Sequence, residues 1–185
     1  MIDYNKMQTD ISRLGKMVNV ITDTGITNLA VKKEKWLQWK KANESYLNQI
    51  FDYERKEGMP AIYQLFNIFF HPTLDLIGIN YSQGAHNMLH KFESGWPDTL
   101  KLCRGIIFDF NGNLVAKPFD KFFGLNEHPE TMEDKLPTNE AFTIYEKYDG
   151  HMGICFLYKD QIVFTTRGSF EYSQSLVRLF RSNNI

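Results

Sequence analysis

The spacing of apolar residues changes once along this chain, and that change limits the folds that the chain can adopt. Up to about residue 73, apolar residues recur at intervals of three and four, as they do on one face of an α-helix. From about residue 74 to 170 they form short runs separated by turn residues, which is typical of strands joined by hairpins. The sequence therefore predicts an α+β fold, with a mainly helical region 1–73 followed by antiparallel hairpins in region 74–185.

Three helices are predicted in the first region. They cover residues 1–20, residues 34–51 and a segment that opens at Pro60 and ends before His71-Pro72. Gly15 weakens the first prediction, because glycine is a poor helix former. The second helix carries an aromatic stripe at helical spacing, which favours packing in a core over stacking on nucleic-acid bases.

Two hairpins are predicted in the second region, and a last helix is expected after Ser169. Asn111-Gly112 is the stronger turn signal, because both central positions of a two-residue hairpin turn need positive φ. The other turn is expected at Lys159-Asp160. The strands that these turns join are residues 103–110 with 114–119, and residues 152–158 with 161–166.

Composition restricts the class of function. The net charge of -1 gives no overall basic field, so binding of nucleic acid must depend on a local patch. Cys103 and Cys155 lack metal-ligand spacing and lie in strand-like runs, so we expect buried free thiols in a reducing, cytoplasmic compartment. The first residues do not resemble a signal peptide, and no apolar run is long enough to span a membrane.

Lys147 is the main candidate for a catalytic residue. It lies in Glu146-Lys147-Tyr148-Asp149-Gly150 and follows the apolar run 142–145, which we expect to be a strand. A strand would fix the position of the lysine, and the glycine would let backbone and substrate approach closely, as an amine nucleophile requires. Alone, however, K-x-D-G is a weak signal, and a surface lysine beside an Asp-Gly turn is the simpler interpretation.

Three further cations lie in the same β region, namely Arg104, Lys121 and Arg167. If the strands form one sheet, these residues could converge with Lys147 on one pocket. Such a pocket would suit a triphosphate, because arginine binds phosphate oxygens in pairs and lysine supplies a point charge. Nearby cations also lower the pKa of a lysine amine and so favour its nucleophilic form. Each cation taken separately could instead be a solvated residue at a strand edge.

Four motifs occur in a fixed order along the β region. They are Cys-Arg-Gly-Ile-Ile-Phe from residue 103, Lys-Pro-Phe-Asp-Lys-Phe-Phe-Gly-Leu-Asn-Glu from 117, Glu-Lys-Tyr-Asp-Gly from 146 and Thr-Arg-Gly-Ser from 166. In this order they resemble the phage RNA ligase 1 family, whose members are covalent nucleotidyltransferases and share the K-x-D-G lysine with DNA ligases and capping enzymes. The resemblance covers about residues 74–185 and implies the N-terminal part of an adenylyltransferase domain.

The resemblance also implies a role for each matched residue. Lys147 would attack the α-phosphorus of ATP, release pyrophosphate and carry AMP. The other candidates would bind the nucleotide: Glu146 beside the adenine, Asp149 and Gly150 at the turn near the ribose, Arg104 and Lys121 at the phosphates, and Arg167 and Gly168 near the sugar or the RNA end.

In this family AMP then passes to the 5′-phosphate of an RNA, and a 3′-hydroxyl attacks the activated end, with Mg²⁺ as the second cofactor; tRNA is one candidate substrate. Family members continue into strands that carry a metal-binding glutamate and two lysines, and nothing in residues 170–185 resembles either motif. After Gly150 the family tends to have a small residue, whereas this chain has His151. We therefore expect the front part of a ligase. Three alternatives stay open: a DNA ligase or GTP-dependent capping-type enzyme, an ATP- or RNA-binding module without the chemistry, and a structural domain with a chance motif.

Overall fold

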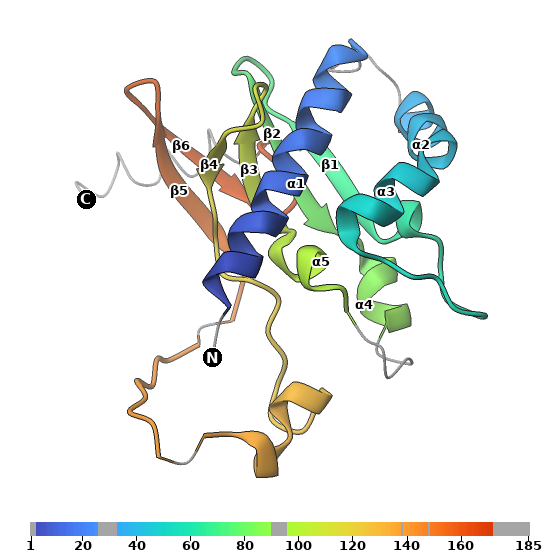
Figure 1. Ribbon diagram of the computed structural model, residues 1–185. Coiled ribbons are helices and arrows are strands. Elements are labelled where there is room, and N and C mark those ends of the chain that lie inside the picture. The colour runs from blue at the N-terminus through green and yellow to red at the C-terminus, as the bar shows by residue number, and fades with distance from the viewer. Residues whose placement is uncertain (1–2, 26–32, 90–95, 138, 148, 172–185) are drawn as a thin grey trace.

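The computed structural model describes residues 3–25, 33–89, 96–137, 139–147 and 149–171. It shows the expected α+β arrangement, in which an N-terminal helix is followed by antiparallel sheets (Figure 1). Within these residues, no helix is both long and apolar enough to cross a membrane.

Helices and strands alternate along the chain more often than the sequence suggests. The helical elements are α1 (Tyr4–Asp23), α2 (Lys33–Ala42), α3 (Glu44–Phe51), α4 (Gln83–Leu89), α5 (Asp98–Leu102) and the short 3-10 turns η1 (Ile62–Gln64), η2 (Pro129–Thr131) and η3 (Glu133–Lys135). The strands are β1 (Phe66–Phe70), β2 (Leu76–Tyr81), β3 (Arg104–Asp109), β4 (Leu114–Ala116), β5 (Gly153–Tyr158) and β6 (Gln161–Thr166).

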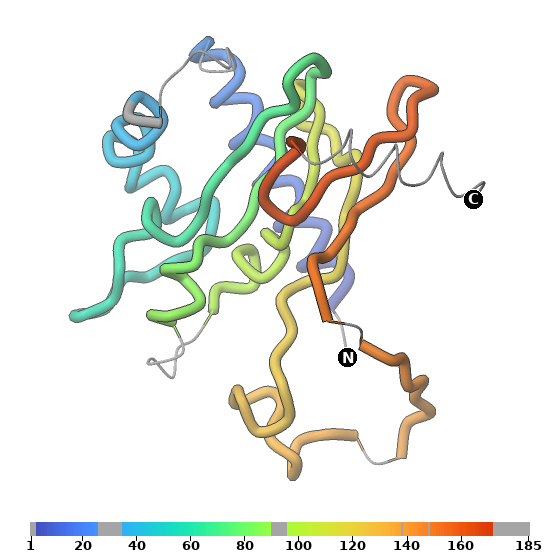
Figure 2. The backbone as a smooth tube through the Cα atoms, turned by 180° about the vertical axis from the view of Figure 1, so that it is seen from behind, coloured from blue at the N-terminus to red at the C-terminus, as the bar shows by residue number. Residues whose placement is uncertain are grey.

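The molecule has three layers. Strands β1 to β4 form an antiparallel sheet in chain order, α1 crosses one face of it, and the β5–β6 hairpin lies behind the other face (Figures 1 and 2). Strand β3 is buried on both sides: Ile106 and Phe108 pack in the core with the helices, whereas Ile107 packs with Val163 of β6. This double burial explains the unbroken apolar run in β3, because a half-exposed strand would alternate with polar residues.

Helix α1 contacts the β3–β4 connection closely enough to require glycine on both sides. A Cβ atom on Gly15 would lie 2.4 Å from the carbonyl oxygen of Gly112. Two turns further on, the hydroxyl of Thr22 donates a hydrogen bond of 3.0 Å to the carbonyl oxygen of Phe110. Gly15 therefore lowers the helix propensity of α1 but allows the helix to lie directly on the sheet.

The turn at Asn111-Gly112 differs from the prediction. The connection spans four residues, and only Gly112 has positive φ, at 74°. The carboxylate of Asp109 stabilises the loop by accepting hydrogen bonds of 2.9 Å from the backbone N–H groups of Asn111 and Asn113. Positive φ at two successive positions occurs instead at Lys159-Asp160, with values of 48° and 58°.

Two of the predicted helices also differ. The segment 34–51 divides into α2 and α3 at Asn43, and the helix predicted after Pro60 is only η1 followed by strand β1. Strand β1 pairs with β2, so the expected boundary between residues 73 and 74 falls inside a hairpin of the main sheet. The helix expected after Ser169 lies outside the described residues.

Of the two free thiols, Cys103 is buried as expected, but Cys155 is exposed because it faces outward on β5.

The aromatic stripe of α2 packs in the interior, as its spacing indicates. Trp36 and Trp39 stack on each other with ring centroids 5.2 Å apart, and both pack against the core. The neighbouring Lys40 is also buried, and its ammonium donates hydrogen bonds of 2.6 and 2.8 Å to the carbonyl oxygens of Tyr63 and Phe66. Lys40 thus ties α2 to the start of β1.

Candidate nucleotide site

Three of the four predicted cations come together at one end of the main sheet. Arg104 begins β3, Lys121 lies in the loop after β4, and Arg167 directly follows β6. Partial burial lowers the pKa of Lys121 below its usual value, and the charges of Arg104 and Arg167 lower it further, although Glu127 and Glu130 oppose them. We call these three residues the cation cluster.

Gly105 allows Arg104 and Arg167 to approach each other. Its φ of 89° belongs to the left-handed region that favours glycine. A Cβ atom at this position would lie 3.0 Å from the Cα of Arg167 and 2.8 Å from Cδ1 of Ile154. The glycine of the Cys-Arg-Gly motif therefore lets the end of β6 pack directly against the start of β3.

Aromatic rings support each member of the cation cluster. The Lys121 ammonium lies 3.9 Å from the ring centroid of Phe123, and the Arg104 guanidinium carbon lies 4.7 Å from that of Phe122. Arg167 lies 4.9 Å from the ring of Tyr81 and donates a hydrogen bond of 2.7 Å to its hydroxyl. Such contacts fix the direction of a cation without neutralising its charge.

The aromatic residues also connect the cluster to the core. Trp96 packs edge-on against Tyr81 and against Phe123, with centroid distances of 4.9 and 6.0 Å. Neither Tyr81 nor Trp96 was predicted from the sequence as part of a site. No signal in the sequence indicates them, because the fold alone brings them to the cluster: Tyr81 ends β2 next to Arg104 in the sheet, and Trp96 lies two residues before α5.

Carboxylates offset the charge of the cluster only in part, because Glu127 and Glu130 act on Lys121 through space. In the part of the chain that the structure describes, Arg104, Lys121 and Arg167 form no ion pair with aspartate or glutamate. Three cations that are held by aromatic rings, and that make no direct ion pair with a carboxylate of the described residues, form a site that favours a multiply charged anion. A triphosphate is one such anion.

Lys147 lies apart from the cation cluster. The chain from residue 117 to 152 leaves the sheet as a long arm and returns to begin β5 (Figures 1 and 2). Lys147 lies on the returning part of the arm and is exposed, and among the described residues it makes no hydrogen bond or ion pair. The strand expected over residues 142–145 is absent. Its apolar side chains are open to solvent, with Ile144 83% exposed, because no strand in the described part of the chain pairs with it.

The remaining candidates lie on the same arm or beside the cluster. Glu146, Asp149 and Gly150 are exposed, and Gly150 has a φ of 133° in open space. Tyr148 lies outside the described residues. Gly168 follows Arg167 and is exposed, near the side-chain amide of Asn80.

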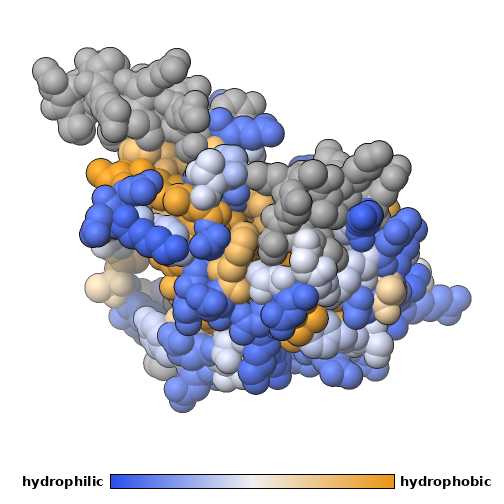
Figure 3. Space-filling model, turned by 90° about the horizontal axis from the view of Figure 1, so that it is seen from above, coloured by the Kyte–Doolittle hydropathy of each residue, from blue (hydrophilic) through white to orange (hydrophobic). Residues whose placement is uncertain are grey.

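An open groove of about 850 Å³ lies between the loop after β4 and strand β5, and its walls are residues 115–122 and 152–156. Both β4 and β5 are edge strands of their sheets. Most of the residues that line the groove are apolar, and two of them, Phe119 and Phe122, are 79% and 54% exposed. Apolar surface gathers on one side of the view in Figure 3, whereas polar surface covers most of the remainder. The groove therefore offers an apolar surface next to Lys121, which could receive the base of a nucleotide.

Comparison with known proteins agrees with this geometry. Residues 102–182, which contain the whole cation cluster and Lys147, match the sequence model of a family described as RNA ligase. The segment is similar to RNA ligases. The resemblance recognised in the sequence is therefore confirmed for this part of the chain.

A curated relative supports the same similarity over a shorter stretch. It is named "Putative RNA ligase", comes from Thermovibrio ammonificans, and is 48% identical over 50 residues. These residues are 26% of this chain and 13% of the relative. The match to the RNA ligase family thus covers the β region that forms the site, and it does not extend to α1, α2 or α3.

Proposed function

We propose that this chain forms the nucleotide-binding part of an ATP-dependent RNA ligase, in which Lys147 becomes covalently linked to AMP. The observation that carries the proposal is the convergence of Arg104, Lys121 and Arg167, none of which forms an ion pair with a described carboxylate, inside the segment that matches RNA ligases. In the proposal, Arg104 and Lys121 bind the phosphates, Arg167 and Gly168 lie at the sugar or RNA end, and Glu146, Asp149 and Gly150 surround the nucleoside.

The proposed chemistry is an in-line phosphoryl transfer. The neutral amine of Lys147 attacks the α-phosphorus of ATP, an N–P bond forms, the bond to the β-phosphate oxygen breaks, and pyrophosphate leaves. The amine loses a proton to water in the same step. An oxygen of an RNA 5′-phosphate then attacks the AMP phosphorus, the N–P bond breaks and the Lys147 amine is restored. An RNA 3′-hydroxyl finally attacks the activated 5′-phosphate, and AMP leaves. The cation cluster would stabilise negative charge on the phosphates, which is where charge must be held during this transfer.

For this reaction Lys147 must approach the cation cluster. The proposal therefore requires the returning part of the arm, residues 139–150, to fold toward the groove beside Lys121. The exposed apolar side chains of this segment and the apolar wall of the groove are compatible in chemistry.

In the proposal, Mg²⁺ enters the site bound to the nucleotide. The described residues contain no group of three histidine, cysteine, aspartate or glutamate side chains suited to a metal ion. In the proposal Mg²⁺ is carried by the phosphates of ATP, and we derive no step from a metal held by these residues.

Binding of ATP tests the proposal at the cation cluster. We expect Arg104→Gln, Lys121→Met and Arg167→Gln each to raise the Kd for ATP by about tenfold or more, because each removes a charged donor to phosphate. The matched control is Lys159→Met, since Lys159 forms an exposed ion pair with Asp75 away from the cluster. Equal affinities in all four variants and in the unmodified chain would contradict the proposal.

A nucleotide- or RNA-binding module is the second candidate, and the separation of Lys147 from the cluster favours it. A sealing assay with labelled RNA that carries a 5′-phosphate and a 3′-hydroxyl distinguishes the two functions. The ligase seals this RNA with ATP and not with GTP, whereas the module binds ATP or RNA and seals nothing. Transfer of GMP instead of AMP would indicate a capping-type enzyme.

A further inference from the structure

We propose that Lys101 of α5 is a positioning residue for the cation cluster, because it anchors the loop that carries Lys121 at two points. This inference rests on the proposed function, since the role that it gives Lys101 is to hold Lys121 where a nucleotide phosphate binds. The inference also assigns a structural role to α1, which lies outside the segment similar to RNA ligases.

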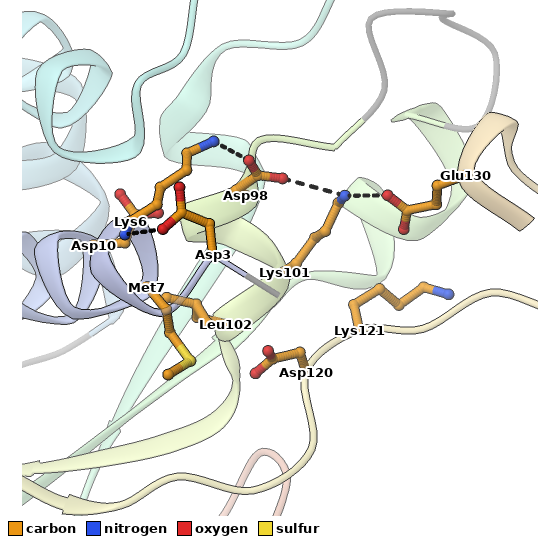
Figure 4. A pocket seen from close by; sticks show the side chains of 10 residues that line it. All are labelled: Asp3, Lys6, Met7, Asp10, Asp98, Lys101, Leu102, Asp120, Lys121 and Glu130. Atoms are coloured by element: carbon orange, nitrogen blue, oxygen red, sulfur yellow. Dashed lines mark hydrogen bonds and ion pairs between the residues drawn. The ribbon is translucent and has the colours of Figure 1, made fainter. Parts of the chain in front are cut away.

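The first anchor is a backbone contact, and the second is an ion pair. The carbonyl oxygen of Lys101 accepts a hydrogen bond of 2.8 Å from the backbone N–H of Lys121. The Lys101 ammonium lies 2.8 Å from the carboxylate of Glu130, in η2, at the other end of the same loop (Figure 4). One residue of α5 therefore holds both the cationic end and the far end of the loop over residues 121–130.

The Lys101 side chain is well suited to this role. It is only 16% exposed, whereas the side chain of Glu130 is 47% exposed, so water screens the ion pair mainly from the carboxylate side. The same ammonium lies 3.3 Å from Asp98, which keeps it between two carboxylates. A lysine held from both sides has little freedom, and the loop that it binds is restricted with it.

The ion pairs continue into α1. Lys6 of α1 donates a hydrogen bond to the second carboxylate oxygen of Asp98, so the contacts run from Lys6 through Asp98 and Lys101 to Glu130 (Figure 4). Further along, α1 is fixed to the β3–β4 connection by its contact at Gly15. The helix is thus attached to the sheet and, through α5, to the loop that carries Lys121. We infer that α1 braces this loop.

Four variants test the proposal: Lys101→Met, Lys101→Arg, Glu130→Gln and the double variant Lys101→Met with Glu130→Gln. Loss of the ion pair should raise the Kd for ATP by about three- to tenfold, the usual size of an effect transmitted through a packed network. Lys101→Arg should retain most of the affinity. The double variant should bind ATP about as well as Lys101→Met alone, because both changes remove the same contact.

Lys159→Met is again the control and should leave the affinity unchanged. The proposal is overturned if Lys101→Met and Glu130→Gln bind ATP like the unmodified chain. It is also overturned if their effects multiply in the double variant, because the two residues would then act independently.

Backbone hydrogen exchange separates failure of this inference from failure of the proposed function. In Lys101→Met without nucleotide, we expect faster exchange in peptides from residues 117–131 and unchanged exchange in β2 and β3. Unchanged exchange in the loop overturns the anchoring role, whatever the affinity for ATP. If the unmodified chain does not bind ATP, the proposed function fails. The role of Lys101 at a nucleotide site then fails as well, even if hydrogen exchange shows that Lys101 anchors the loop.

Discussion

Gly105→Ala should separate the two arginines of the cation cluster, because it introduces a methyl group where β3 and the end of β6 meet. The φ of 89° costs an alanine about 1 to 2 kcal/mol. The new Cβ would lie 3.0 Å from the Cα of Arg167 and 3.2 Å from its carbonyl oxygen, which are backbone atoms that cannot rotate away. Overpacking of this kind costs about 1 to 3 kcal/mol, so we expect a total loss of about 2 to 5 kcal/mol of unfolding free energy.

Urea unfolding followed by tryptophan fluorescence measures this loss. Gly153→Ala is the matched control, because Gly153 begins β5 in the same hairpin but a Cβ there meets no atom within 4 Å. The control should change the unfolding free energy by less than about 0.5 kcal/mol. We also expect Gly105→Ala, measured where it is folded, to bind ATP more weakly than the control. If the two variants were equally stable, the close approach of β3 and Arg167 would be refuted.

Three further predictions concern stability and reactivity. Burial lowers the pKa of Lys40 to about 8, so the unfolded chain binds more protons than the folded chain between about pH 8 and 10.5. The unfolding free energy should therefore rise by about 2 kcal/mol from pH 7 to 9.5, and Lys40→Met should remove this rise; an unchanged slope would contradict burial of the charge. Gly15→Ala should destabilise the fold by about 1 to 3 kcal/mol in urea unfolding despite the better helix propensity of alanine, whereas Lys16→Ala on the exposed face should not. Under native conditions a thiol reagent should modify Cys155 rapidly and spare Cys103, because burial raises the pKa of the Cys103 thiol; modification of both at similar rates would contradict the fold.

The sequence predicted the fold class because apolar spacing follows the secondary-structure period over most of the chain. The prediction from sequence failed where tertiary contacts determine the local structure. Phe66–Phe70 continues a helix-like apolar pattern after Pro60, yet this segment is a strand because β2 offers it a full set of backbone partners. Gly15 lowers helix propensity, and only the contact with Gly112 explains its place within α1.

The candidate site was predictable in part. The order of the motifs led to the hypothesis that Arg104, Lys121 and Arg167 share one site, and the structure places these three residues together. The aromatic partners Tyr81 and Trp96 were not predictable, since they come from other elements and reach the cluster only through the sheet and α5. The strand expected before Lys147 does not form, because a strand needs a pairing partner and the described residues supply none.

The most direct test of the central claim is the covalent transfer of AMP to Lys147. The chain is incubated with ATP labelled at the α-phosphate and Mg²⁺, and the protein is then separated on a denaturing gel, together with Lys147→Ala. The account predicts a label that stays on the unmodified protein, is released by acid, and is absent from Lys147→Ala. A protein that remains unlabelled, or a label that persists in Lys147→Ala, would contradict the account.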